Sequence, residues 1–221
     1  MIKIAVGFDQ REAVAYHAFC QSVIEKASEP VQFIPLAKNL LNGFDGQRDG
    51  SNAFIYSRFL VPYLMDFSGF CIYADGDMIC NADIAELWAL QDHYKAVQVV
   101  KHDYKTKHLI KYLGQRNDNY PRKNWSSLIL WNCASFPNRQ LTPEFIAKQS
   151  GAFLHRFQWV DDERIGELPG EWNWLSTEYP DNNAAKLIHY TIGLPAFEDY
   201  KHAPMAQFWH STHRRLNEPA S

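Results

Sequence analysis

The chain has 221 residues, 46% hydrophobic and 21% charged, which suits one α/β domain or one domain with a small appendage. Its 22 Lys and Arg stand against 25 Asp and Glu, and the net charge of −3 does not favour nucleic-acid binding. No apolar run has the length of a membrane-spanning helix and no signal peptide opens the chain, so we expect a cytoplasmic protein without a transmembrane segment.

The opening third of the chain has the pattern of an α/β protein. Apolar residues over Ile2–Gly7 predict a buried strand, and helical spacing of apolar residues predicts a helix within Glu12–Ala27. A second strand is predicted over Val31–Ile34, before Pro35. A strand, a helix and a strand in this order favour a parallel sheet with a crossover helix.

The rest of the chain continues this pattern without a repeat or a linker, so we expect a single domain over residues 1–221. Polar, glycine-containing residues 39–52 predict a loop, and the polar segment 101–124 predicts an excursion over the active face. Further strands are predicted over 70–74, 96–100, 127–131 and 187–190, and helices over 53–65, with Pro62 as a break, over 83–90 and from Thr142-Pro143.

Two carboxylates follow the predicted strand 70–74. Ligands of open α/β sheets bind beyond the carboxyl ends of the strands, and Asp75 and Asp77 stand at such an end. Alternation along an extended chain puts both side chains on one side, where they repel each other unless a cation lies between them. Oxygen ligands suit Mg²⁺ or Mn²⁺, although Asp-Gly-Asp is also ordinary turn chemistry.

Several motifs, in order, resemble the retaining family 8 glycosyltransferases. They are Tyr56-Ser57-Arg58-Phe59, Ile72 to Ile79 around Asp75-Gly76-Asp77, Asp83 to Trp88, Trp125 to Asn132, Asp161-Asp162-Glu163 with Leu168-Pro169 and Trp172-Asn173, and His189-Tyr190-Thr191. The resemblance covers about Ile2 to Pro195. It implies the GT-A fold, in which helices flank a mixed, mostly parallel central sheet. Residues 1–100 would form the nucleotide-binding half, residues 101–200 the half that binds the donor sugar and the acceptor, and residues 201–221 a C-terminal tail.

The resemblance also implies the reaction. A divalent metal, Mn²⁺ or Mg²⁺, is expected on Asp75, Asp77 and His189, and a nucleotide-sugar donor, with UDP as the nucleotide, is expected to pass its sugar with retention to an acceptor hydroxyl. The acceptor would be a carbohydrate, a lipid-linked molecule or a protein. Donor contacts are implied for Asp9 at the base, Arg58 at the diphosphate or sugar, Asp75 at the ribose, and Trp125 and Ser126 at the sugar. Two of these residues have an alternative role. Asp9 would equally well cap the following helix, and Arg58 would equally well lie on the surface of a helix.

The resemblance also implies catalytic residues. Asp161 and Asp162 stand where the family has an acidic residue and an amide beside the reacting sugar. A carboxylate at Asp162 would stabilise an oxocarbenium-like centre or act as a nucleophile, and the other interpretation of the pair is a helix N-cap with a first-turn acid. Arg58 is the third residue implied near the reacting centre.

One departure from the family leaves alternatives open. The family has a Lys a few residues after its histidine, which grips the diphosphate, and none follows His189 before Lys201. Lys201 or Arg58 would have to replace it. A non-catalytic nucleotide-sugar or carbohydrate-binding protein is therefore an alternative. A haloacid-dehalogenase-like phosphatase is another, since such enzymes also carry D-x-D after an apolar strand. Their motif normally belongs to the first strand and is followed by Thr or Val, whereas here a strand, a helix and a strand precede Asp75 and Met78 follows Asp77.

Overall fold

The computed structural model describes residues 1–41 and 55–217. Most of the predicted loop 39–52 and the first two residues of the predicted helix 53–65 lie outside these ranges. Within them, every helix is too short or too polar to cross a lipid bilayer.

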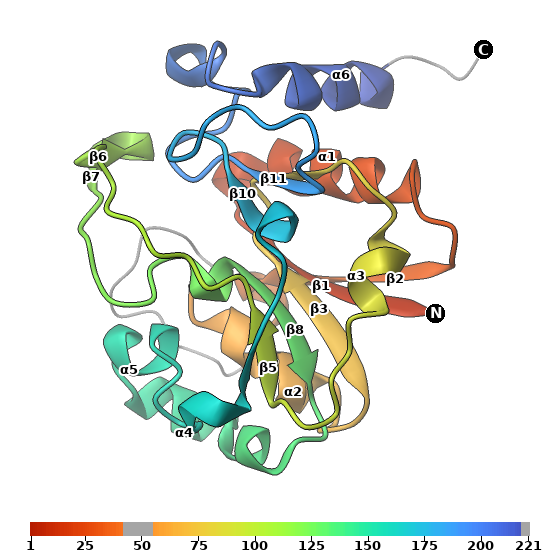
Figure 1. Cartoon of the computed structure of the whole chain (residues 1–221), viewed down its shortest axis with the longest axis vertical. Helices are drawn as coiled ribbons and strands as arrows, with labels where there is room; N and C mark the ends of the chain where they lie inside the picture. Colours follow the sequence, from red (N-terminus) through yellow and green to blue (C-terminus); the bar gives the residue numbers. More distant parts are fainter. Residues whose placement is uncertain (42–54, 218–221) are drawn as a thin grey trace.

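A six-stranded sheet forms the centre of the molecule, in the order β2-β1-β3-β8-β5-β9 (Figure 1). Strand β8 pairs antiparallel with both of its neighbours, whereas the other pairs are parallel. The predicted mixed, mostly parallel sheet is therefore confirmed. The strands are β1 Ile2–Phe8, β2 Val31–Ala37, β3 Phe70–Ala74, β5 Val97–Val99, β8 Leu128–Asn132 and β9 Ile165–Glu167.

Helices pack against apolar side chains on both faces of this sheet. Phe19 of α1 and Leu87 of α3 share one buried cluster with the sheet, and Ile146 of α4 and Leu154 of α5 belong to another. Burial of strand residues on both sides explains why they are almost continuously apolar. The helices are α1 Ala13–Ile24, α2 Val61–Leu64, α3 Ile84–Trp88, α4 Pro143–Lys148, α5 Gly151–His155 and α6 Ala206–Asn217.

A second, smaller sheet brings distant parts of the chain together. It has the order β10-β11-β4, made of Trp174–Leu175, Leu187–His189 and Met78–Cys80. Strand β11 runs antiparallel to β4, with His189 opposite Met78, and the Tyr190 N–H donates to the Asp77 carbonyl at 3.0 Å. This pairing places His189 beside the carboxylates that follow β3. A two-stranded hairpin is formed by β6 Ile110–Lys111 and β7 Gln115–Arg116.

The helix ends follow the capping residues in the sequence. The Thr142 hydroxyl accepts the Phe145 N–H at 3.2 Å, and Asp83 accepts the Ala85 N–H at 2.9 Å, as N-caps of α4 and α3. The predicted end of the second strand at Pro35 is wrong, because β2 is an edge strand and tolerates a residue without an N–H. Short 3₁₀ helices cover Gln10–Glu12, Lys38–Leu40, Ser57–Leu60, Tyr112–Gly114, Trp125–Ser127, Phe136–Gln140, Asp162–Arg164, Gly170–Asn173 and Glu198–Tyr200.

Candidate active site

The Asp75-Gly76-Asp77 turn is fixed between two strands. The Asp75 N–H donates to the Ser127 carbonyl at 2.9 Å, just before β8. A Cβ on residue 76 would stand 2.6 Å from the Gly7 carbonyl oxygen of β1, so only glycine fits this close approach. The two carboxylates are thus held at the carboxyl ends of β1 and β3, where the sequence places a ligand site.

Asp75, Asp77 and His189 form a group able to hold a metal ion. Each offers one ligand atom, and the three atoms lie within 4.8 Å of one another. The fold therefore brings the two aspartates and the distant histidine together, as expected. Two carboxylates and an imidazole are a donor set that suits Mn²⁺ or Mg²⁺.

Hydrogen bonds around His189 fix which ring nitrogen faces the carboxylates. Asn173 uses its amide N–H to donate to the Ser127 hydroxyl at 2.9 Å, so its Oδ1 is left to accept from His189 Nδ1 at 3.0 Å. The tautomer with a proton on Nδ1 leaves a lone pair on Nε2, which lies 3.3 Å from Asp77 Oδ1.

This contact is unfavourable without a positive charge. Asp77 Oδ1 is buried and has no hydrogen-bond partner among the described residues. With a neutral imidazole, two acceptor atoms 3.3 Å apart repel each other, and a buried unpaired carboxylate oxygen costs free energy. A divalent cation between them would satisfy both atoms, which is the observation that fits these residues to a metal.

Arg58 supports the buried Asp75. Its Nη2 lies 3.0 Å from Asp75 Oδ1, and its Nη1 donates to the Ser126 carbonyl at 2.8 Å. The Tyr73 hydroxyl also donates to Asp75. Burial raises the pKa of Asp75, and the Arg58 guanidinium acts in the opposite direction. The expected surface alternative for Arg58 is wrong, since its side chain is only 6% exposed.

A cavity of about 370 Å³ opens in front of this group. Asp75, Asp77 and His189 form one side of it, and Lys111 from the excursion 101–124 reaches it as well, as that segment was expected to do. Burial lowers the pKa of Lys111, whereas Asp77 and Asp75 raise it. The other lining residues are Ile55, Arg58, Tyr120, Asn124, Ser126, Ser127, Gly151, Ala152, His155, Arg156 and Thr191.

An adjoining hollow contains a further carboxyl group, that of Glu12. Glu12, Asp77 and Lys111 line it together. Burial, with the carboxylates of Asp77 and Asp9 as the next causes, raises the pKa of Glu12 to about 8. A cation bound at the turn would reduce the repulsion between these carboxyl groups.

Sequence reasoning missed His155, which forms a neutral pair with Ser126 in the cavity wall. His155 Nδ1 lies 2.7 Å from the Ser126 hydroxyl oxygen. Burial lowers the pKa of His155 to about 3, and the charges of Arg58 and Lys111 act in the same direction. The imidazole therefore stays uncharged near neutral pH, and the group that it presents to the cavity is a neutral hydrogen-bonding one. Its local signal, a histidine in the last turn of a short helix, is too common to have indicated this role.

The depressed pKa of His155 predicts a pH-dependent stability. As the pH falls from 7 to 5, the unfolded chain binds a proton at this histidine and the folded chain does not, so the free energy of unfolding should fall by about 2 kcal/mol from this group. Urea denaturation at both pH values should show a decrease smaller by this amount in His155→Gln. His202→Gln, at an exposed histidine, is the control, and equal decreases in wild type and His155→Gln would contradict the prediction.

Asp9 and Trp125 lie outside the residues that line the cavity. The Asp9 carboxylate accepts the Arg11 N–H at 3.0 Å and caps the 3₁₀ helix Gln10–Glu12, as its alternative role required. Trp125 donates its indole N–H to the His102 carbonyl at 2.9 Å, and the Arg122 guanidinium lies over its ring at 5.2 Å. Their predicted contacts with the base and the sugar stay predictions.

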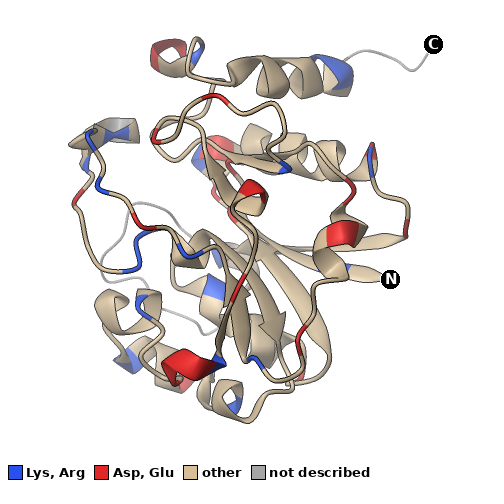
Figure 2. Ribbon diagram, in the orientation of Figure 1, with Lys and Arg blue, Asp and Glu red and all other residues tan. Residues whose placement is uncertain are grey.

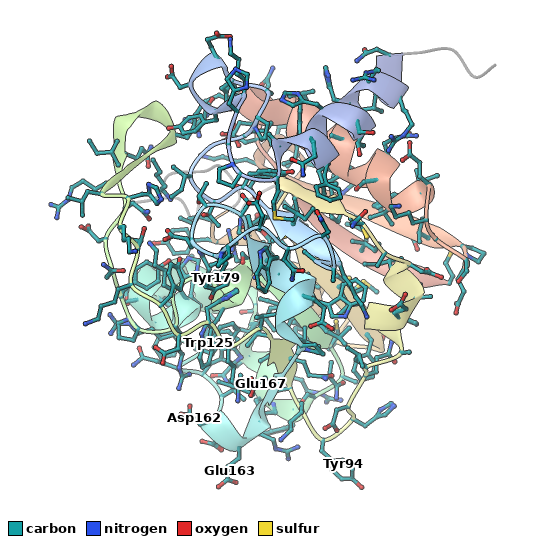
Figure 3. The ribbon with its side chains drawn as sticks, turned by 45° about the horizontal axis from the view of Figure 1, so that its top comes forward. Tyr94, Trp125, Asp162, Glu163, Glu167 and Tyr179 are labelled. Carbon is teal, nitrogen blue, oxygen red and sulfur yellow. The ribbon has the colours of Figure 1, made fainter. Side chains whose placement is uncertain are left out.

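The structure does not bring Asp161 and Asp162 to the cavity. They line a separate hollow with Arg122 and Phe157, and the Asp162 side chain is 77% exposed and pairs with Arg122 at 2.6 Å. Figure 3 shows Asp162 near the periphery, in the segment that leads to β9 at the sheet edge. That segment turns the side chain toward solvent, and the catalytic role implied for the pair stays a prediction.

The structure offers Lys111, rather than Lys201, as the cation opposite the carboxylates. Lys201 pairs with Glu198 on the turn before α6 and does not line the cavity. Lys111 was missed because nothing in its polar surroundings distinguishes it in the sequence from the neighbouring lysines.

Comparisons with known proteins agree on the kind of protein. A family model described as glycosyl transferase family 8 matches residues 10–136. Protein CDI of Arabidopsis thaliana is 40% identical over 217 residues, which are 94% of this chain and 84% of that protein.

Two solved structures show the same fold at low sequence identity. The bifunctional glycosyltransferase WbbM has a TM-score of 0.69 and 16% identity, and the match covers 96% of this chain but only 49% of that chain, so this chain spans about half of its length. The galactosyltransferase LgtC, solved with donor and acceptor sugar analogs, has a TM-score of 0.64 and 12% identity, with 100% of this chain and 98% of that chain covered.

Proposed function

This chain belongs to glycosyl transferase family 8, and from that premise we propose that it transfers a sugar from a UDP-sugar to an acceptor hydroxyl, with a divalent cation on Asp75, Asp77 and His189. The predicted GT-A fold is confirmed by the likeness to WbbM and LgtC. The observation that carries the proposal is the 3.3 Å approach of two acceptor atoms, Asp77 Oδ1 and His189 Nε2.

Residues of this chain would hold the metal ligands in position and contact the donor sugar. Arg58 holds Asp75 in place by an ion pair, and Asn173 holds His189 through Nδ1. When bound, the cation would neutralise charge on the departing diphosphate. Ser126 and His155 would offer uncharged hydrogen-bonding groups to the sugar in the same cavity. We propose retention at the anomeric carbon, as in the family.

Lys111 is proposed as the residue that replaces the family's lysine at the diphosphate. Lys111→Gln should weaken binding of UDP about tenfold in the presence of Mn²⁺, because a charge-assisted contact to a phosphate is lost, and should leave the weak binding of uridine unchanged. Calorimetric titrations of both ligands measure the difference. Lys201→Gln is the matched control, and a UDP affinity that falls in this control and not in Lys111→Gln would contradict the assignment.

The test of the proposed function is release of UDP from UDP-sugars. We expect Mn²⁺-dependent release of UDP from at least one of UDP-glucose, UDP-galactose, UDP-N-acetylglucosamine and UDP-xylose, slowly by hydrolysis and faster with an acceptor, and no release with a chelator. Absence of release from all four, together with hydrolysis of p-nitrophenyl phosphate, would contradict the proposal in favour of a phosphatase. The family membership does not favour that alternative.

A further inference from the structure

A hairpin projects from the body beside the active-site cavity. It consists of β6 and β7, and Figure 1 shows it at one side of the molecule. The Tyr112 N–H donates to the Ile192 carbonyl at 2.8 Å, and the Tyr112 ring stacks on Phe197 with centroids 4.4 Å apart. The hairpin is therefore fixed to the body at this point.

The first residue of the hairpin and the residue before it expose two adjacent aliphatic side chains. Leu109 is 74% exposed and Ile110 is 64% exposed. They are held in place rather than left loose, because the Asn117 N–H donates to the Leu109 carbonyl at 2.9 Å and the Asn117 side chain donates to the His108 carbonyl at 2.7 Å. The pair therefore forms a small, ordered apolar patch, and apolar patches rimmed by polar residues are the kind of surface that contacts proteins or membranes.

Basic residues outnumber acidic ones in the segment that carries this pair. Residues 101–123 hold seven Lys and Arg against two Asp, in a chain whose net charge is −3. Lys105 and Lys107, just before the aliphatic pair, are exposed, and Figure 2 shows basic positions along this segment. Arg116 is also exposed and pairs with Asp118 at 2.9 Å. Exposed aliphatic side chains flanked by lysines suit the boundary between anionic lipid headgroups and acyl chains.

We propose that this surface, residues 105–116, docks on an anionic membrane, with Leu109 and Ile110 entering the headgroup boundary and Lys105 and Lys107 binding lipid phosphates. Lys111 of the same surface lines the active-site cavity, so docking would bring the cavity close to the membrane. From this we infer that the acceptor is lipid-borne, an inference that rests on the proposed function. A soluble polyanion would use the lysines and would gain nothing from the aliphatic pair.

The test is co-sedimentation of the full chain with vesicles of phosphatidylcholine alone, or mixed equally with phosphatidylglycerol. Wild type should partition onto the mixed vesicles about tenfold more strongly than onto the neutral ones. The double variants Leu109→Ser/Ile110→Ser and Lys105→Gln/Lys107→Gln should each lose most of this partitioning. Phe136→Ser removes an exposed aromatic residue, 84% exposed, from another surface and should change nothing.

Titration with UDP and Mn²⁺ separates this proposal from the proposed function. All variants should bind UDP as wild type does, which also shows that they are folded. A wild-type chain that binds UDP but stays in solution with both kinds of vesicle overturns the membrane proposal alone. Equal partitioning of the Leu109→Ser/Ile110→Ser variant and wild type also overturns it, because lysines alone would then explain the attraction.

Discussion

Replacing Asp77 with alanine is expected to abolish Mn²⁺-dependent UDP binding and to lower sugar transfer by about 100-fold or more, without lowering the stability of the fold. Loss of a group that only supports a metal ligand already costs about 10- to 100-fold, so loss of a ligand should cost at least the upper value. In the absence of metal, the stability should be unchanged or higher. The buried Asp77 Oδ1 has no hydrogen-bond partner among the described residues, and its repulsion with His189 Nε2 is removed.

Urea denaturation and UDP calorimetry on the same preparation measure both effects. Glu163→Gln, which removes an exposed carboxylate near the sheet edge, is the control and should retain metal-dependent binding. A destabilised Asp77→Ala chain would show that the carboxylate is structural. Retention of Mn²⁺-dependent UDP binding would remove Asp77 from the metal site.

Replacing Arg58 with methionine is expected to cause a large loss of stability, in contrast to Asp77→Ala. The variant leaves the buried Asp75 carboxylate without its guanidinium partner and removes the N–H that Arg58 donates to the Ser126 carbonyl. Breaking a buried ion pair in this way costs about 3–5 kcal/mol. Sugar transfer should fall as well, because Asp75 is no longer held in position.

The loss of stability in Arg58→Met should depend on the pH and on the presence of the Asp75 carboxylate. Burial raises the pKa of Asp75, and without Arg58 the pKa rises further, so the folded variant is favoured below this pKa and loses stability as the pH increases through it. Denaturation at pH 5.5 and pH 8 should therefore show a greater deficit at pH 8. The double variant Arg58→Met/Asp75→Asn should recover most of the stability, and a deficit equal to that of Arg58→Met alone would show that the ion pair does not carry the effect.

The sequence was sufficient for the carboxylates and for the strands that carry them. A wholly apolar strand ending in Asp-Gly-Asp predicts a ligand site at the edge of a parallel sheet, and the structure places Asp75 and Asp77 there. His189 came from the resemblance alone. Its approach to Asp77 depends on the pairing of β11 with β4, and β4 has three residues, too few to give a periodic signal.

Two features of the site could not be predicted because they depend on tertiary packing. Lys111 lies in a two-residue strand within a polar segment, and only the fold of that segment over the cavity distinguishes it from neighbouring lysines. The direction of Asp162 is a second case. Its position in the motif is clear, but the 3₁₀ turn Asp162–Arg164 sets the side chain toward Arg122 and solvent. Short turns of this kind have no reliable sequence signature.

Titration of UDP into the wild-type chain, with Mn²⁺ and with a chelator, tests the central claim most directly. The arrangement of Asp75, Asp77 and His189 predicts saturable binding of UDP with Mn²⁺ and little or none with the chelator. Equal binding of UDP under both conditions would contradict the metal site, and absence of binding under both would contradict UDP as the nucleotide of the donor.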